Sequence, residues 1–146
     1  MKVTMYTPEE IPGLLREHGI NATLQRLEIA RVMFTHGGHF SAEEVFTLVN
    51  GDQPHVSKAT VYNTLGLFAE NGLIHQVIVD PTKVFYDANT VPHHHFYNVS
   101  TGTLSDINAH EVSVTGLPPL PEGVQMDGID VIVRVRHNKT EDSASS

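Results

Sequence analysis

The chain has 146 residues, a formal charge of −8 at pH 7, ten histidines and no cysteine. The lack of cysteine excludes disulfides, thiolate zinc sites, iron–sulfur clusters and a cysteine nucleophile, so any bound metal must take nitrogen and oxygen ligands. The acidity argues against nonspecific coating of nucleic acid, and because no stretch approaches about 20 apolar residues we expect a cytoplasmic protein without a membrane partner.

Four helices are predicted between about Thr7 and Leu73. The first is expected to begin at Thr7 and to end at Gly19, since threonine is a good N-cap and the proline after it suits a first turn. The second is expected to begin at Thr23 and to end at Gly37–Gly38, after apolar residues with a period near 3.6.

The third and fourth helices are predicted to start at serines. Ser41 and Glu44 have the spacing of a capping box, in which each side chain accepts from the backbone amide of the other residue. That helix should break at Asn50–Gly51. Ser57 caps the fourth helix, which should end at Asn71–Gly72.

A hairpin of two short strands is predicted over Leu73–Val79 and Val84–Tyr86, with a turn at Asp80–Lys83. Helices followed by such a hairpin form a winged helix-turn-helix, in which the fourth helix is placed to enter the major groove of DNA. We therefore expect the fold class α+β, with this winged helix over residues 1–86.

The character of the sequence changes after Asp87. Short strands are predicted at Phe96–Val99, Thr103–Ile107, Glu111–Val114 and Ile129–Val135, with a proline-rich link at Gly116–Gly123. Residues 87–137 are expected to form a small second lobe, and the polar residues 138–146 a disordered tail.

The start of the fourth helix carries groups suited to DNA. Lys58 suits phosphate, Thr60 adds a hydroxyl, Tyr62 can pack on a thymine methyl, and Asn63 can pair with adenine. Free backbone amides at a helix start also attract phosphate. The same pattern fits an ordinary amphipathic helix with a solvated face.

A second constellation is His93-His94-His95, with Asp87 before it and Asp106 after it. On a strand, His93 and His95 share one face and can chelate one ion, while His94 points to the other face. Imidazoles with two carboxylates suit Fe²⁺, Mn²⁺ or Zn²⁺, and the oxygen donors favour iron or manganese. The alternative is a solvated histidine cluster at a turn.

His36 and His39 fall in the predicted turn between two helices. They are either exposed loop histidines, or one of them joins the metal site of the second lobe. In that case, metal binding would fix the relative orientation of the two lobes and act as a switch.

Two histidines and a carboxylate also compose the facial triad of mononuclear non-haem iron enzymes. Such enzymes need an open position beside a substrate pocket, whereas over half of this chain, residues 1–86, is expected to form the winged helix suited to DNA. We therefore expect a DNA-binding regulator and not an enzyme.

Between about Gly19 and Ile107 the chain resembles the ferric uptake regulator (Fur) family. The motifs that carry the resemblance are Thr23–Arg26, His39–Val45, Ala59–Leu65, Glu70–Ile74 and His93–His95. The resemblance implies a homodimer with an N-terminal winged helix and a C-terminal α/β dimerisation lobe. Such a dimer, when metallated, binds double-stranded promoter DNA that contains an inverted repeat.

By the same resemblance, the regulatory ion is Fe²⁺ or Mn²⁺, and Asn21 and Arg26 join the fourth helix in contacting DNA. The implied metal ligands are His39, Asp87, His93, His95 and Asp106. Asn21 stands where relatives often carry a basic residue, which weakens a contact in the minor groove.

Two branches of the family remain open. The aspartate at Asp106 is similar to the peroxide-responsive (PerR) branch. The triple histidine with Phe96–Tyr97, the Leu117–Pro119 link and the ending Asp130–Arg136 resemble the haem-responsive iron response regulator (Irr) branch. In that branch haem would be bound by His93, His94 and His95.

The chain also departs from the family pattern. Most relatives have a structural zinc site of two Cys-x-x-Cys pairs, but Asn98 and Thr101 stand where the first pair would be, so no structural zinc held by four cysteines is expected. A second family metal site would use His94 with a carboxylate near Ser113, which serine does not supply. The dimerisation helix is shortened into the Gly116–Gly123 link.

Overall fold

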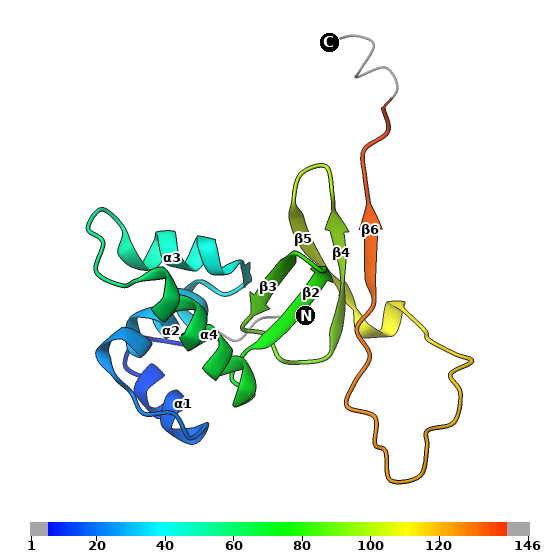
Figure 1. Ribbon diagram of the computed structural model, residues 1–146, viewed down its shortest axis with the longest axis horizontal. Helices are drawn as coiled ribbons and strands as arrows, with labels where there is room; N and C mark the ends of the chain where they lie inside the picture. Colours follow the sequence, from blue (N-terminus) through cyan, green and yellow to red (C-terminus); the bar gives the residue numbers. More distant parts are fainter. Residues whose placement is uncertain (1–5, 140–146) are drawn as a thin grey trace. The chain divides into compact units, whose positions relative to one another are not determined.

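The computed structural model describes residues 6–139. The chain divides into two compact units between Val91 and Pro92 (Figure 1). The predicted tail, residues 138–146, lies almost entirely outside the described part. Among residues 6–139, no helix combines the length and apolar character needed to cross a membrane.

The first helix, α1 (Ile11–Glu17), begins later than predicted. Thr7 does not cap it; instead its backbone amide donates to Glu10 Oε1 at 2.8 Å in the turn that precedes the helix. Pro12 occupies the first turn of α1, where its missing N–H costs no helical hydrogen bond. The second proline of the segment therefore sets the start of the helix.

The other helices of the first unit begin and end as predicted. They are α2 (Leu24–His36), α3 (Ala42–Asn50) and α4 (Lys58–Glu70). Thr23 accepts a hydrogen bond from the amide of Arg26 at 3.3 Å. Ser41 and Glu44 form both bonds of the capping box, at 2.8 and 3.2 Å. Ser57 accepts from the amide of Thr60 at 3.1 Å.

One apolar core lies beneath these helices. Its fully buried side chains include Leu15, Ile29, Met33, Val45, Val61, Leu65 and Phe68. The helix α4 buries Val61, Thr64, Leu65 and Phe68. Its residues Lys58, Tyr62 and Asn63 are exposed.

The sheet of the first unit contains one strand that the sequence did not predict. Its antiparallel strands are β1 (His39–Phe40), β2 (His75–Asp80) and β3 (Lys83–Asp87), in the order β1-β3-β2. Gly37 and Gly38, with φ of 72° and 86°, turn the chain after α2 in a conformation that favours glycine. This turn brings β1 alongside β3.

The second unit is built on a sheet in the order β5-β4-β6, with β4 and β6 parallel. Its elements are β4 (His93–Asn98), β5 (Thr103–Asn108), the 3-10 turn η1 (Ala109–Glu111) and β6 (Ile132–Val135). The predicted strand over Glu111–Val114 is wrong, because Asn108 and Glu111 form a capping box that starts η1. Residues 112–131 contain neither helix nor strand.

Candidate metal centre and DNA-binding helix

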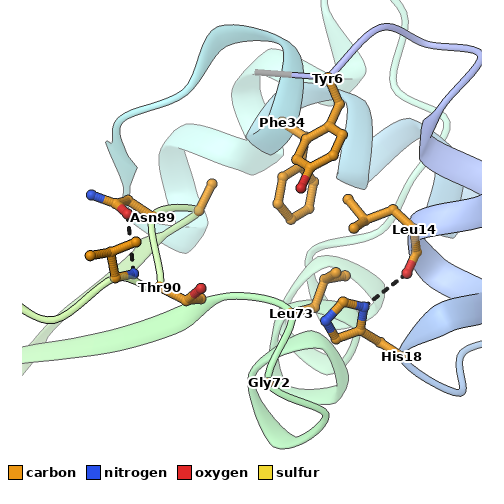
Figure 2. Close-up of a pocket in the computed structure, with 10 residues that line it drawn as sticks. Tyr6, Leu14, His18, Phe34, Gly72, Leu73, Asn89 and Thr90 are labelled. Atoms are coloured by element: carbon orange, nitrogen blue, oxygen red, sulfur yellow. Dashed lines mark hydrogen bonds between the residues drawn. The ribbon is translucent and has the colours of Figure 1, made fainter. Parts of the chain in front are cut away.

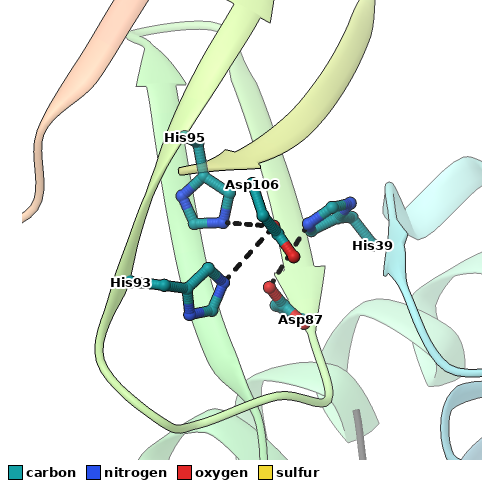
Figure 3. Close-up of side chains that lie close together, drawn as sticks. All are labelled: His39, Asp87, His93, His95 and Asp106. Atoms are coloured by element: carbon teal, nitrogen blue, oxygen red, sulfur yellow. Dashed lines mark ion pairs between the residues drawn. The ribbon is translucent and has the colours of Figure 1, made fainter. Parts of the chain in front are cut away.

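The sheet of the first unit carries a histidine–carboxylate pair. His39 of β1 and Asp87 of β3 are direct cross-strand partners, and His39 Nε2 is 3.4 Å from Asp87 Oδ2 (Figure 3). Asp87 is 1% exposed, and its other oxygen accepts from the amide of Asn89 at 2.9 Å. A buried carboxylate is costly without donors or positive charge, so this pair is suited to a cation.

The second unit carries a group of three potential ligands. His93 and His95 lie on one face of β4, and both are buried. Their Nε2 atoms are each 3.5 Å from the same oxygen of Asp106, which is the cross-strand partner of His95. The ring centroids of the two histidines are 4.5 Å apart. Two imidazoles thus converge on one carboxylate (Figure 3).

His94 and His36 lie apart from these groups in their own surroundings. His94 is on the opposite face of β4, and its Nδ1 accepts from the amide of Val131 at 3.0 Å. His36, at the end of α2, is exposed and contacts the hydroxyl of Thr35 at 3.3 Å. His36 is the last residue of α2, and His39 lies between α2 and α3. Of these two, it is His39 that pairs with a carboxylate.

The spacing of these donors fits ligands of a metal ion. Two donors that are each about 2.1 Å from one ion, at a near-tetrahedral angle, lie about 3.4 Å apart. The three N···O distances are 3.4, 3.5 and 3.5 Å, longer than a good N–H···O hydrogen bond. The donors are all nitrogen and oxygen, which suits Fe²⁺ and Mn²⁺.

The predicted DNA-binding residues lie on α4 and at the start of α2. Lys58 places its ammonium group 5.7 Å from the centre of the Phe46 ring. The hydroxyl of Thr60 accepts a hydrogen bond from the hydroxyl of Ser57 at 2.9 Å. The side chain of Tyr62 is 44% exposed.

At the start of α2, the side chain of Arg26 reaches back along the chain. Its Nη1 atom donates to the carbonyl oxygen of Asn21 at 3.1 Å. This bond holds the guanidinium beside an exposed asparagine. Because Arg26 is bonded to Asn21, a DNA contact made by one of these residues would also affect the position of the other.

Asn50 orders the loop before α4, a role for which no sequence motif provided a signal. Its Oδ1 accepts from the amides of His55 and Val56, both at 2.8 Å. Its Nδ2 donates to the carbonyls of Phe46 and Val56 at 2.9 and 3.0 Å. Asn50 is buried, so these bonds hold residues 51–56, the loop that leads to α4, in place.

The same loop is attached to α2 by His55, whose Nε2 is 2.7 Å from Glu28 Oε2. The pKa of His55 is raised above its usual 6.5 by its hydrogen bond to the Gln53 carbonyl and by Glu28. These two residues, His55 and Glu28, are 27 positions apart in the sequence, so only the folded chain brings them together.

A small cavity of about 130 Å³ lies beside the last residues of the first unit (Figure 2). Tyr6 and Phe34 form an edge-to-face pair on one side, with ring centroids 5.7 Å apart. On the other side, Asn89 accepts from the amide of Val91 at 3.2 Å. Asn89 therefore orders the chain immediately after Asp87.

Comparisons with known proteins agree with this architecture. The model of the ferric uptake regulator family matches residues 17–129. The peroxide-responsive repressor PerR of Staphylococcus aureus (strain Mu50) is 32% identical over 98 residues, 67% of this chain. The match spans 66% of the length of that curated relative.

Two solved structures have the same fold. The ferric uptake regulator of Francisella tularensis with iron has a TM-score of 0.67 at 21% identity, with 83% of this chain and 94% of that chain covered. That of Pseudomonas aeruginosa with manganese has a TM-score of 0.66 at 24% identity, covering 87% and 97%. These likenesses confirm the predicted fold class.

Proposed function

Because this chain belongs to the ferric uptake regulator family, whose members are transcription regulators and not enzymes, we propose that it is a metal-dependent DNA-binding repressor. The proposed division is a winged helix over residues 1–86 that binds promoter DNA and a second domain over 87–137 that holds metal and pairs two copies. The DNA would be an inverted repeat, because a two-fold dimer presents two recognition helices.

The observation that carries this proposal is the pair of histidine–carboxylate groups, one on each unit. They flank residues 88–92, where the two units divide, and five residues separate Asp87 from His93. An ion that took ligands from both groups would fix α4 relative to the second unit. It would thereby set the spacing of the two recognition helices of a dimer.

The proposed effector is Fe²⁺ or Mn²⁺. Its ligands would be His39, Asp87, His93, His95 and Asp106. Bound there, the ion would neutralise the two carboxylates, and a ferrous ion would also react with peroxide. The aspartate at Asp106 and the 32% identity to a peroxide-responsive repressor support a peroxide signal. Haem bound at His93–His95 is the alternative.

The test is to titrate the metal-free protein with Fe²⁺, Mn²⁺ or haem, anaerobically and at fixed salt. DNA selected from a random library by the metal-loaded protein serves as the probe. We expect Fe²⁺ and Mn²⁺ to tighten binding, and peroxide to abolish binding of the ferrous form only. His95→Ala should remove the response, whereas His110→Ala, outside both groups, should keep it.

The other outcomes assign the signal differently. Release of DNA by haem, with a Soret band from histidine ligation, would support the haem-responsive alternative. A metallated protein that selects no inverted repeat would refute the proposed repressor.

A further inference from the structure

The second unit has very little core of its own. Among its described residues, the buried hydrophobic side chains are those of Tyr97 and Ile107, whereas ten large hydrophobic side chains are exposed. Burial of apolar surface is the main force that stabilises a fold. Exposed apolar surface on this scale marks an interaction site.

Nine of these ten exposed side chains, all except Val99, form two patches. The first is the outer face of the sheet, opposite His93 and His95. Phe96 of β4 is the cross-strand partner of Val133 of β6, and Val135 is two residues further along the same face. We call this patch the outer face.

The second patch is on residues 112–131, which we call the strap. Figure 1 shows it as a long excursion (yellow to orange) between η1 and β6. Its exposed apolar side chains are Val114, Leu117, Leu120, Val124, Met126 and Ile129. A stretch of this length without secondary structure is uncommon in a compact domain and is usually either a functional loop or a linker.

The sequence of the strap determines how it can be covered. Pro118, Pro119 and Pro121 lack the amide hydrogen needed by a helix interior or a sheet ladder. The segment around these prolines is therefore unsuited to a helix interior or to a central strand of a sheet. The apolar side chains of the strap can instead be buried by packing directly against another apolar surface.

We propose that the strap of each copy packs across the outer face of a second copy of this chain. The second unit then has a complete core only in this exchanged dimer. The inference rests on the homodimer of the proposed function and specifies the segment that makes it. A second copy fits because each chain carries one strap and one face, so a two-fold pairing makes the same contact twice and closes.

The exposed area is close to what a dimer needs. Full burial of one aliphatic side chain removes roughly 60–120 Å² of apolar surface, and the nine side chains of the two patches are 36–53% exposed. Covering them would bury roughly 400 Å² of apolar surface per copy. A stable interface buries about 800 Å² per partner, a little over half of it apolar.

Sedimentation equilibrium of the full chain and its variants tests this inference. The strap variant combines Leu117→Ser, Leu120→Ser and Val124→Ser; the face variant combines Phe96→Ser and Val133→Ser. A matched control changes three exposed side chains of the first unit, Leu24→Ser, Leu48→Ser and Ile78→Ser. We expect the control to dimerise like the unaltered chain. The strap and face variants should each dissociate at least about 100-fold more readily.

Mixing the strap and face variants tests directly whether the strap of one copy contacts the face of the other. The mixed dimer keeps one intact contact, between the unaltered strap of one copy and the unaltered face of the other. It should therefore form at least about 10-fold more tightly than either variant alone. This gain would also show that both variants are folded.

Other outcomes overturn the inference. A strap variant that stays dimeric removes the strap from the interface. Loss of the dimer in both variants without a gain on mixing would place the strap on its own chain. A dimeric face variant would indicate contact between straps. An unaltered chain that is monomeric at micromolar concentration refutes the homodimer of the proposed function itself.

Discussion

His95 of β4 lies directly across from Asp106 of β5, and its Nε2 is 3.5 Å from the Asp106 carboxylate. His39 and Asp87 stand in the same relation across β1 and β3. The register of two backbone ladders therefore aligns both groups of potential ligands. A slip of one residue in either ladder would turn a ligand to the opposite face.

Asp106→Ala is expected to lower the affinity for Mn²⁺ by at least about 100-fold, because it removes the carboxylate on which His93 and His95 converge. Isothermal titration calorimetry of the metal-free protein measures this change. Asp127→Ala, which removes an exposed carboxylate of the strap, is the matched control. Equal affinities for the two variants would exclude Asp106 as a ligand.

Lys58→Ala and Asn63→Ala should weaken DNA binding in different ways. Loss of a phosphate contact lowers affinity for all sequences and reduces the salt slope by about 1, whereas loss of a base contact relaxes preference at one position. Fluorescence anisotropy at several salt concentrations, with the selected inverted repeat and point-substituted versions of it, separates the two effects. An unchanged salt slope in Lys58→Ala would contradict the phosphate contact.

Asn50→Ala should reduce the free energy of unfolding by about 2–4 kcal/mol, because the amide of Val56 and other buried groups lose their partner. Urea denaturation followed by circular dichroism measures the change. Asn71→Ala is the control, since Asn71 makes an exposed bond to the Leu67 carbonyl at 2.8 Å and should cost less than about 1 kcal/mol. Similar losses of unfolding free energy in the two variants would show that the bonds of Asn50 do not stabilise the loop before α4 more than an exposed bond does.

The bond between His55 and Glu28 should make stability depend on pH. The folded state raises the pKa of His55 above 6.5, through Gln53 first and Glu28 second, so it binds the proton more tightly than the unfolded chain. The resulting stabilisation is full below about pH 6.5 and is lost as the pH rises through the raised pKa.

Glu28→Gln should therefore lower the pKa of His55, as measured by the NMR titration of its ring. Glu43→Gln makes the same chemical change on α3 and should leave the His55 titration where it is. If Glu28→Gln also leaves the pKa of His55 unchanged, the contact with Glu28 on α2 does not affect the protonation of His55.

The start of α1 shows where two local signals compete. Thr7-Pro8 and Ile11-Pro12 both offer a proline at a first turn, and the capping preference of threonine favoured the earlier start. In the fold, the Glu10 side chain binds the amide of Thr7, and the helix starts at Ile11. Propensity alone could not rank the two, because the burial of Ile11 and Leu15 in the core adds to the later start.

Features that depend on neighbours within four residues could be predicted from the amino-acid order. The caps at Thr23, Ser41 and Ser57, and the shared face of His93 and His95, are set by local hydrogen bonds and by the two-residue period of a strand. Other features emerged only in the folded chain: the pairing of β1 with β3, the parallel β6, and the contact of His55 with Glu28. These depend on chain segments that meet only after the core has formed, because register and packing, which no local pattern encodes, bring them together.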